Sequence, residues 1–393
     1  MTEKEYVAGR ARKFIAWMKE QKLDAAVISR PEDIFYFSRF NPIIASKPPY
    51  FIFTAEGRAC LLTQSLRLNH AREESAVTDI QGYGVWGDIP ILDGDPIGAI
   101  AKIIGAKNGK IRLGVEYGAL NLLTYRKLTD AIPVGETVDV SGQVEKMKQI
   151  KDIYEIGHIR KASALADVCA DTMRKELAAG ETEAAVCVKG HYAMKKYWLT
   201  HFPEEEIAGF SEGGILDALM CWCNSGSRIA FACDCPKPQL PKKGELVVSY
   251  IWGKISGYHS EVERTYFTGR LDALRERAVA TVQESRTAML AALKPGITFG
   301  ELFEVGCEAY RRHDLEQMIP GSFGHGIGLS AHESLGIGKN RREVIQPNMV
   351  FTVEPGLTSL EWGGGRISET VLATEDGYEL LTKADASICS VRE

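Results

Sequence analysis

Two glutamates and a histidine alternate along one short stretch of the chain, residues 257–267. His259, Glu261 and Glu263 are separated by single residues, and β-branched or aromatic side chains fill many of the surrounding positions. Because side chains alternate between the two faces of a strand, a strand here would put the imidazole and both carboxylates on one face. Such a face is either the solvated surface of an edge strand or one side of an acidic site.

Three other stretches combine glycines or a turn with polar side chains. Between residues 321 and 333, His325 and His332 lie among glycines, which let the backbone approach a ligand and leave an imidazole unpacked. Glu354 ends an apolar strand pattern, where a buried charge is costly unless another group meets it. Alternation along residues 366–374 would put three polar side chains on one strand face: Arg366, Ser368 and Thr370.

Helical and strand-like patterns alternate along the whole chain, which is typical of an α/β fold. A charged run at residues 144–151 precedes a long amphipathic pattern, so we place the domain boundary near Val144, between residues 1–143 and 144–393. Helices are expected at residues 7–21, 97–104, 120–131, 152–177, 181–197, 278–293 and 299–312. Strands are expected at residues 23–29, 49–54, 59–63, 110–116, 246–252, 257–267, 349–354 and 366–374.

The overall composition is that of an ordinary globular protein. The 393 residues are 45% hydrophobic and 25% charged, and the net charge of −5 leaves no basic footprint for nucleic acid. The charged N-terminus leads into an amphipathic pattern, and no apolar run is long enough to span a bilayer. The sequence therefore predicts a soluble cytoplasmic protein with neither nucleic acid nor membrane as a partner.

Nine cysteines in a chain without an export signal predict reduced thiols and no disulfide framework. Four of them form two Cys-x-Cys pairs on either side of a turn-rich segment, so a hairpin could bring them together: Cys221, Cys223, Cys233 and Cys235. A zinc site or redox pair is one interpretation, although structural zinc sites usually use a wider Cys-x₂₋₄-Cys spacing. Buried free thiols are the other interpretation.

Taken together, several motifs resemble the creatinase and aminopeptidase P superfamily, whose pita-bread fold also occurs in methionine aminopeptidases and prolidases. The resemblance covers most of the chain and is carried by residues 147–156, 263–265, 324–329, 332–333, 353–356 and 365–367. It implies an N-terminal creatinase-like domain with a mixed sheet, followed by a pita-bread catalytic domain. Any one of these motifs alone would be much less specific.

The resemblance implies metal ligands that this chain matches only in part. The family's peptidases hold two divalent metals with two aspartates, one histidine and two glutamates. His325, Glu354 and Glu261 stand at three of these positions, whereas Tyr250 and Ser368 occupy the other two. Since a dinuclear cluster needs several anionic oxygens, we do not expect one here. A single ion on Glu261, His325 and Glu354 is the alternative to a site without metal.

Creatinase works without metal and carries a glutamate in a similar segment, so Glu263 is expected to contact a cationic group. The sequence thus favours a metal-independent hydrolase that cleaves a C–N bond in a small zwitterionic, nitrogen-rich metabolite. In this hypothesis His325 activates water, His332 assists the leaving group, and Glu261, Glu263 and Glu354 surround the cationic group. A thiolate of Cys233, which stands where the family has a histidine, is the alternative nucleophile.

Two other functions stay open. One is an Xaa-Pro dipeptidase or aminopeptidase P-like enzyme with a degenerate mononuclear metal site, and the other is a pita-bread protein that binds peptides or proteins without catalysis. The resemblance also implies a homodimer in which the N-terminal domain completes the partner's active site. The full set of expected substrate-binding residues is Glu263, Tyr250, Cys233, Arg366, Ser368, Lys47 and Tyr50.

Overall fold

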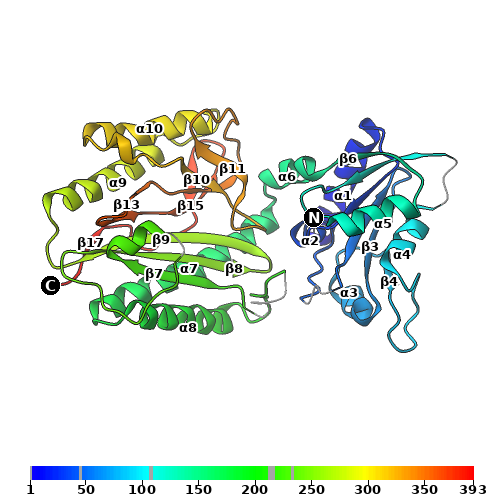
Figure 1. Cartoon of the computed structure of the whole chain (residues 1–393), viewed down its shortest axis with the longest axis horizontal. Coiled ribbons are helices and arrows are strands. Elements are labelled where there is room, and N and C mark those ends of the chain that lie inside the picture. Colours follow the sequence, from blue (N-terminus) through cyan, green and yellow to red (C-terminus); the bar gives the residue numbers. More distant parts are fainter. Residues whose placement is uncertain (1, 44–46, 106–108, 211–216, 232–233) are drawn as a thin grey trace. The chain divides into compact units, whose positions relative to one another are not determined.

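The structure is a computed structural model that describes residues 2–43, 47–105, 109–210, 217–231 and 234–393 (Figure 1). The chain divides into two compact units. Unit 1 comprises residues 1–148 and 208–217, and unit 2 comprises residues 149–207 and 218–393. No helix in the described part of the chain is both long and apolar enough to cross a membrane.

Unit 1 is built around a mixed six-stranded sheet in the order β4-β3-β2-β1-β5-β6. Its strands are β1 (Ala25–Ile28), β2 (Tyr50–Thr54), β3 (Ala59–Gln64), β4 (Ile80–Tyr83), β5 (Ile111–Val115) and β6 (Val134–Asp139). Its helices are α1 (Glu3–Glu20), α2 (Pro31–Ser38), α3 (Leu68–Glu74), α4 (Pro96–Ile104), α5 (Leu122–Ala131) and α6 (Ser141–Gln149), the last of which ends one residue beyond the unit. The central strand β1 is buried along its whole length, as its uninterrupted apolar sequence predicts.

The described residues of unit 2 form three sheets and four long helices. The helices are α7 (Ile153–Ala178), α8 (Glu183–His201), α9 (Ala273–Ala292) and α10 (Phe299–Arg312). A four-stranded sheet has the order β17-β9-β8-β7, with strands β7 (Met220–Ser225), β8 (Leu246–Ile255), β9 (Tyr258–Thr268) and β17 (Cys389–Arg392). A five-stranded sheet has the order β11-β10-β12-β15-β16, with strands β10 (Ser322–Gly326), β11 (Glu333–Gly338), β12 (Val350–Val353), β15 (Glu369–Ala373) and β16 (Tyr378–Leu380). Strands β13 (Gly356–Ser359) and β14 (Gly363–Arg366) form a hairpin.

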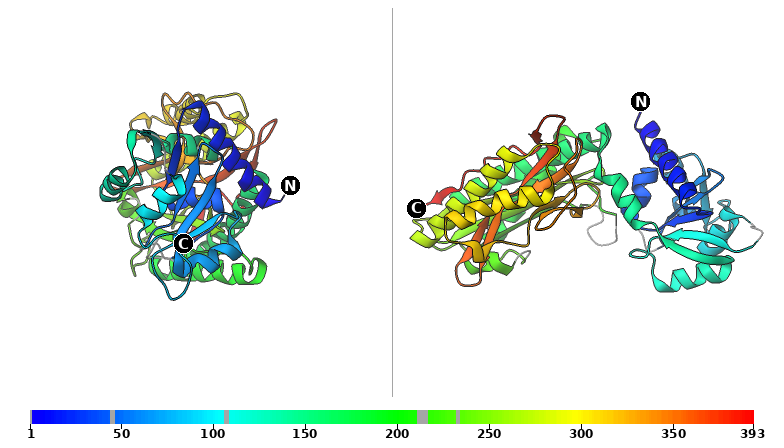
Figure 2. Two further views of the ribbon diagram at one scale, coloured as in Figure 1. Left: turned by 90° about the vertical axis from the view of Figure 1, so that its right-hand side faces the viewer. Right: turned by 90° about the horizontal axis from the view of Figure 1, so that it is seen from above.

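The helices cover the strands of unit 2 from two sides (Figure 1), and α9 and α10 run beside each other over one side in a second view (Figure 2). Strand β8 explains this layering, because alternate side chains enter different cores. Val247, Ile251 and Ile255 pack with α7 and α8, whereas Leu246 and Val248 pack with α9 and α10. Because successive side chains of a strand point to opposite faces, the side chains of β8 and of its neighbour β9 alternate between the two cores.

Helix α7 is fixed at its start by side chains that the sequence supplies. Asp152 accepts hydrogen bonds from the backbone N–H groups of Tyr154 and Glu155, and the Glu155 carboxylate bonds back to the N–H of Asp152. This capping box satisfies donors that a helix end otherwise leaves free. Along its length α7 comes so close to β8 that a Cβ on Gly253 would lie 2.2 Å from the carbonyl oxygen of Ala162. Only glycine fits at that position.

The predicted α/β organisation is confirmed, but one predicted strand is wrong. Residues 366–374 were expected as a continuous strand, whereas the chain leaves the hairpin at Arg366 and enters the five-stranded sheet at Glu369. Between these strands Ser368 forms an isolated bridge with Glu263 of β9. Alternation within a single strand therefore does not relate Arg366, Ser368 and Thr370.

Candidate active site

The acidic stretch forms an internal strand and is not an edge. Strand β9 pairs with β8 on one side and with the C-terminal strand β17 on the other. Glu261 and Glu263 are only 1% and 2% exposed, so the solvated-surface interpretation is wrong. His259 is also buried, with its Nδ1 atom 3.0 Å from the carbonyl oxygen of Gly328. Burial lowers the pKa of His259 to about 3, so this ring is neutral and tied to the backbone.

Glu261 is held by donors from two other strand segments. The indole N–H of Trp252 on β8 donates to Glu261 Oε2 at 2.9 Å, and the hydroxyl of Ser368 donates to Oε1 at 2.6 Å. His325 Nε2 lies 3.3 Å from Glu261 Oε2 and 3.7 Å from Oε2 of Glu354. Strands β8, β9 and β10 and the residues that follow β12 and β14 therefore converge on one carboxylate.

Three glutamates crowd together around this point. One carboxylate oxygen each of Glu261, Glu263 and Glu354 lies within 4.8 Å of the other two. At an effective dielectric constant of about 20, two like charges at that distance repel by about 3 kcal/mol. The cluster is thus unfavourable unless protons or a cation neutralise part of its charge.

The electrostatics divide the three carboxyl groups into two kinds. Burial opposes ionisation of Glu261, but hydrogen bonds from His325 and Ser368 outweigh burial and lower its pKa to about 2. Burial and the neighbouring charge of Glu261 raise the pKa of Glu263 to about 8, and the same two causes raise the pKa of Glu354 well above its ordinary value. Burial opposes a charge on His325, yet Glu261 raises its pKa overall. An ionised Glu261 beside an imidazolium is therefore the preferred state of that pair.

Two further predicted side chains border the cluster. Arg366 Nε lies 3.6 Å from Glu263 Oε2, and the neighbouring Glu263 carboxylate raises the pKa of this guanidinium. The ring of His332 lies 4.1 Å from that of His325, centroid to centroid, on the side exposed to solvent. Burial and the charge of His325 lower the pKa of His332, which favours its neutral form.

The remaining predicted residues fall in different places. Tyr250 pairs with Glu263 in the β8–β9 register and is 5% exposed. Lys47 and Tyr50 belong to unit 1, where Lys47 is exposed and Tyr50 is buried at the start of β2. Cys233 lies outside the described residues. The structure thus brings seven predicted residues together: Glu261, Glu263, His325, His332, Glu354, Arg366 and Ser368.

The sequence did not point to Trp252, although it supplies a hydrogen bond to the buried Glu261. The sequence feature that could have identified Trp252 is its position two residues after Tyr250 on strand β8. Strand alternation puts both rings on the same face of the sheet. Trp222 of β7 packs edge-on against Trp252, with ring centroids 4.9 Å apart. Lys151, which forms a buried ion pair with Glu333 at 2.7 Å, was missed as well.

The cysteine pairs do not form a metal-binding group among the described residues. Cys221 and Cys223 lie on β7, Cys235 is exposed, and the groups with metal-binding geometry contain no described cysteine. Cys221 donates its S–H to the carbonyl oxygen of Cys187 at 3.3 Å. The described part of the Cys-x-Cys hairpin is consistent with free thiols.

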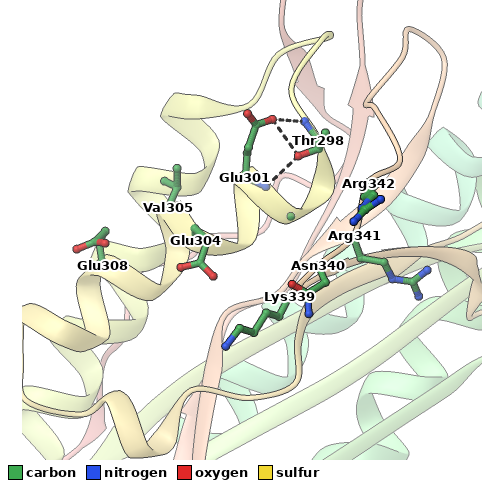
Figure 3. A pocket seen from close by; sticks show the side chains of 10 residues that line it. Thr298, Glu301, Glu304, Val305, Glu308, Lys339, Asn340, Arg341 and Arg342 are labelled. Carbon is green, nitrogen blue, oxygen red and sulfur yellow. Dashed lines mark hydrogen bonds between the residues drawn. The ribbon is translucent and has the colours of Figure 1, made fainter.

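A hollow of about 650 Å³ lies elsewhere, between α10 and residues 339–342 (Figure 3). Its acidic side chains are already engaged: Glu301 closes the capping box of α10, while Glu304 and Glu308 both pair with Arg311. None of the clustered glutamates lines this hollow. We therefore look for chemistry at the glutamate cluster.

The residues of the cluster fit one divalent cation. Glu261, His325 and His332 offer ligand atoms within 4.8 Å of one another, a mixed set of oxygen and nitrogen donors that suits a transition-metal ion. Glu354 adds a carboxylate close to the same imidazole. Ser368 donates its hydroxyl to Glu261 and adds no anionic oxygen. The donor chemistry of the described residues thus suits a divalent ion.

Comparison with known proteins identifies similar chains over nearly the full length. The curated Xaa-Pro dipeptidase of Pyrococcus furiosus is 27% identical over 379 residues, covering 96% of this chain and 99% of that protein. The solved prolidase of Pyrococcus horikoshii superposes with a TM-score of 0.79 at 25% identity, covering 97% of this chain and 99% of the other. The dipeptidase PepE of Mycobacterium ulcerans, at 21% identity and a TM-score of 0.81, shares the fold.

These comparisons correct the predicted chemistry. The chain was expected to be nearer to creatinase and to be a metal-independent C–N hydrolase of small metabolites, but the Pyrococcus proteins that it matches over nearly their full length are Xaa-Pro dipeptidases and prolidases. The expectation that the enzyme uses no metal is wrong for the same reason, since the matching family is one of metallopeptidases. The model of the creatinase/prolidase N-terminal domain matches residues 10–150, and the metallopeptidase M24 model matches residues 157–375. With more than half of its length matched by that second model, the chain belongs to metallopeptidase family M24.

Proposed function

We propose that this protein is a prolidase-like peptidase that cleaves Xaa-Pro dipeptides with a single divalent cation. The observation that carries the proposal is the crowding of three glutamates, two of them beside His325, in a chain that aligns end to end with Xaa-Pro dipeptidases. A cation would offset the crowded negative charge, and the relatives indicate a peptide as substrate.

Glu261, His325 and Glu354 would hold the ion, with His332 beside them. Such an ion supplies Lewis-acid polarisation of the scissile carbonyl group. Trp252 and Ser368 orient the Glu261 carboxylate by donating to its two oxygens, so it needs no rearrangement to act as a ligand.

One imidazole beside the residues that would hold the ion is suited to contact the peptide. His332 is exposed and neutral, and its ring lies 4.1 Å from that of His325. It is placed to hydrogen-bond a peptide that enters from solvent.

A single ion also distinguishes this site from the dinuclear site that the family resemblance implies. Tyr250 and Ser368 replace two carboxylates, and the Ser368 hydroxyl is already used as a donor to Glu261. Adding a second divalent ion would require anionic oxygens that these two side chains do not supply.

The predicted dimer remains part of the proposal. Lys47 is exposed in the segment before β2, where it is available to a second subunit. If one subunit completes the site of the other, Lys47→Ala lowers activity without changing metal content, and sedimentation of the active species gives a dimer.

Metal analysis together with dipeptide cleavage tests the function directly. We expect one Mn²⁺ or Co²⁺ per chain, cleavage of Ala-Pro but not of Ala-Ala, and loss of cleavage in chelator or in His325→Ala. Failure of every metal form to cleave Xaa-Pro dipeptides would refute the proposal, as would full activity in chelator. Exposed Glu316 provides a matched control, since Glu316→Gln should keep both metal and activity.

A further inference from the structure

Glu263 differs from the other two clustered glutamates because one of its carboxylate oxygens is fully buried and has no hydrogen bond among the described residues. Its Oε2 atom is buried and lacks a hydrogen-bond partner among the described residues, although the residue is only 2% exposed. The nearest cation, Arg366 Nε, lies 3.6 Å from this oxygen, which is within ion-pair range but too long for a hydrogen bond. A buried acceptor of this kind is costly unless a ligand supplies the donor.

The backbone around Glu263 holds this oxygen in place. The N–H of Glu263 donates to the carbonyl oxygen of Ser368 at 3.3 Å, and the N–H of Ser368 donates back at 3.1 Å. Ser368 is small, and its hydroxyl turns away to Glu261. The backbone of Ser368 therefore pairs with that of Glu263, but the Ser368 side chain donates no hydrogen bond to the Glu263 carboxylate.

The Glu263 carboxylate also lies beside residues that would hold the ion. Carboxylate oxygens of Glu261, Glu263 and Glu354 lie within 4.8 Å of one another, while His325 and His332 group with Glu261 alone. The nitrogen donors, which suit a transition-metal ion, are thus grouped with Glu261 and not with Glu263, whose described neighbours in the cluster are carboxylates. A second divalent ion there would face the Arg366 guanidinium, whereas a singly charged ammonium would meet less repulsion and would supply hydrogen-bond donors.

We propose that Glu263 binds the protonated α-amino group of the dipeptide, beside the metal-binding residues. This proposal rests on the proposed function, because it assigns the free amino end of that substrate to one carboxylate. Glu263 then determines specificity, because peptides with a free ammonium group form an ion pair with its carboxylate. Peptides whose first residue is acylated, or carries a hydroxyl in place of the amine, cannot form this ion pair. The preferred substrate class is therefore the free Xaa-Pro dipeptide.

Paired substrates test the assignment. Ala-Pro and lactoyl-Pro have nearly the same shape, but lactoyl-Pro has a hydroxyl where Ala-Pro has its ammonium. In Glu263→Gln we expect KM for Ala-Pro to rise about 10- to 100-fold, the range for losing a hydrogen bond between charged groups, while KM for lactoyl-Pro stays within about twofold. Equal changes for both substrates would overturn the proposal.

Metal content separates a substrate-binding role from a ligand role. Elemental analysis should give the same metal-to-chain ratio in wild-type protein and in Glu263→Gln. Loss of the ion from this variant would show that Glu263 is a metal ligand and would overturn the proposal. Glu263→Asp, which keeps the charge but shortens the side chain, should restore part of the preference for Ala-Pro over lactoyl-Pro, and circular dichroism checks that both variants fold.

A binding experiment keeps the inference testable if no dipeptide is cleaved. Calorimetric titration of the metal-loaded protein with methylammonium should give binding in the wild type and in Glu316→Gln, and at least tenfold weaker binding in Glu263→Gln. Binding without dipeptide cleavage would retain the ammonium site while refuting the peptidase function. Equal binding to all three proteins would refute the ammonium site itself.

Discussion

Replacing Glu116 by glutamine should stabilise unit 1 at alkaline pH. Glu116 follows β5, is fully buried, and accepts hydrogen bonds at Oε2 from the backbone N–H groups of Ser29 at 2.5 Å and Arg30 at 2.8 Å. Burial and the adjacent Asp33 carboxyl raise its pKa from 4.5 to about 8. Asp33 in turn accepts a hydrogen bond from Lys148, so the two carboxyl groups form part of one buried polar network.

The direction of the pH effect follows from proton counting. Between pH 4.5 and about 8 the folded protein keeps a proton on Glu116 that the unfolded chain releases, so the free energy of unfolding falls as pH rises through this window. A rise of about 3.5 pH units at 1.36 kcal/mol each sets an upper limit of about 5 kcal/mol. Because relaxation around a buried charge reduces such penalties, we expect a loss on the order of 1–3 kcal/mol.

Glutamine resembles the protonated carboxyl, since its oxygen can accept from Ser29 and Arg30 while its amide donates to Asp33. Glu116→Gln should therefore match the wild type near pH 5 and exceed it by about 1–3 kcal/mol at pH 9. Urea unfolding followed by hydrogen exchange in peptides from β1, α2 and β5 measures unit 1 by itself. If the difference in unfolding free energy between Glu116→Gln and wild type were the same at pH 5 and pH 9, the reasoning would be refuted. Glu73→Gln, at an exposed position on α3, serves as control.

Two other substitutions test the support of the active site. Trp252→Phe keeps an aromatic ring but removes the donor to buried Glu261, so it should lower the free energy of unfolding by about 2 kcal/mol in urea melts. The control Trp222→Phe removes no hydrogen bond to Glu261 and should lower the free energy of unfolding by less. Gly324→Ala would put a Cβ 2.0 Å from a backbone carbonyl oxygen at a φ of +152°. It should lower the free energy of unfolding by on the order of 3 kcal/mol or more and weaken metal binding measured by calorimetry. The control Gly321→Ala has open space at its Cβ and should change neither quantity. Equal effects within either pair would contradict the packing described.

The sequence predicted which residues share the face of β9, because strand periodicity alone determines that. It did not predict whether this face is buried. That depends on β17, whose Cys389 pairs with Tyr266 more than a hundred residues earlier in the chain. An edge strand and an internal strand have the same local pattern, so only the long-range pairing turns the charged face into a site.

The error at residues 366–374 has a similar cause. The alternation there is real, but the chain changes sheets between Arg366 and Glu369, and a local pattern does not record which partner each strand takes. Ser368 reaches the cluster through its bridge to Glu263. The predicted association of Ser368 with the site therefore came from motif spacing and not from the strand face proposed for it.

The erroneous prediction of a metal-free enzyme shows what absent ligands do and do not imply. Tyr250 and Ser368 remove two anionic side chains, yet Glu263, two residues after Glu261 on β9, still lies next to Glu261 and Glu354. Removing ligands lowers the number of cations whose charge the site can balance, but three crowded carboxyl groups still favour a bound positive charge. Whether it arrives as a metal ion, as the ammonium group of a substrate, or as one of each is decided by the side chains at 250, 263 and 368. Substitutions at 250 and 368 should therefore change the number of bound ions, and substitutions at 263 should change the preference for substrate charge, without changing the fold.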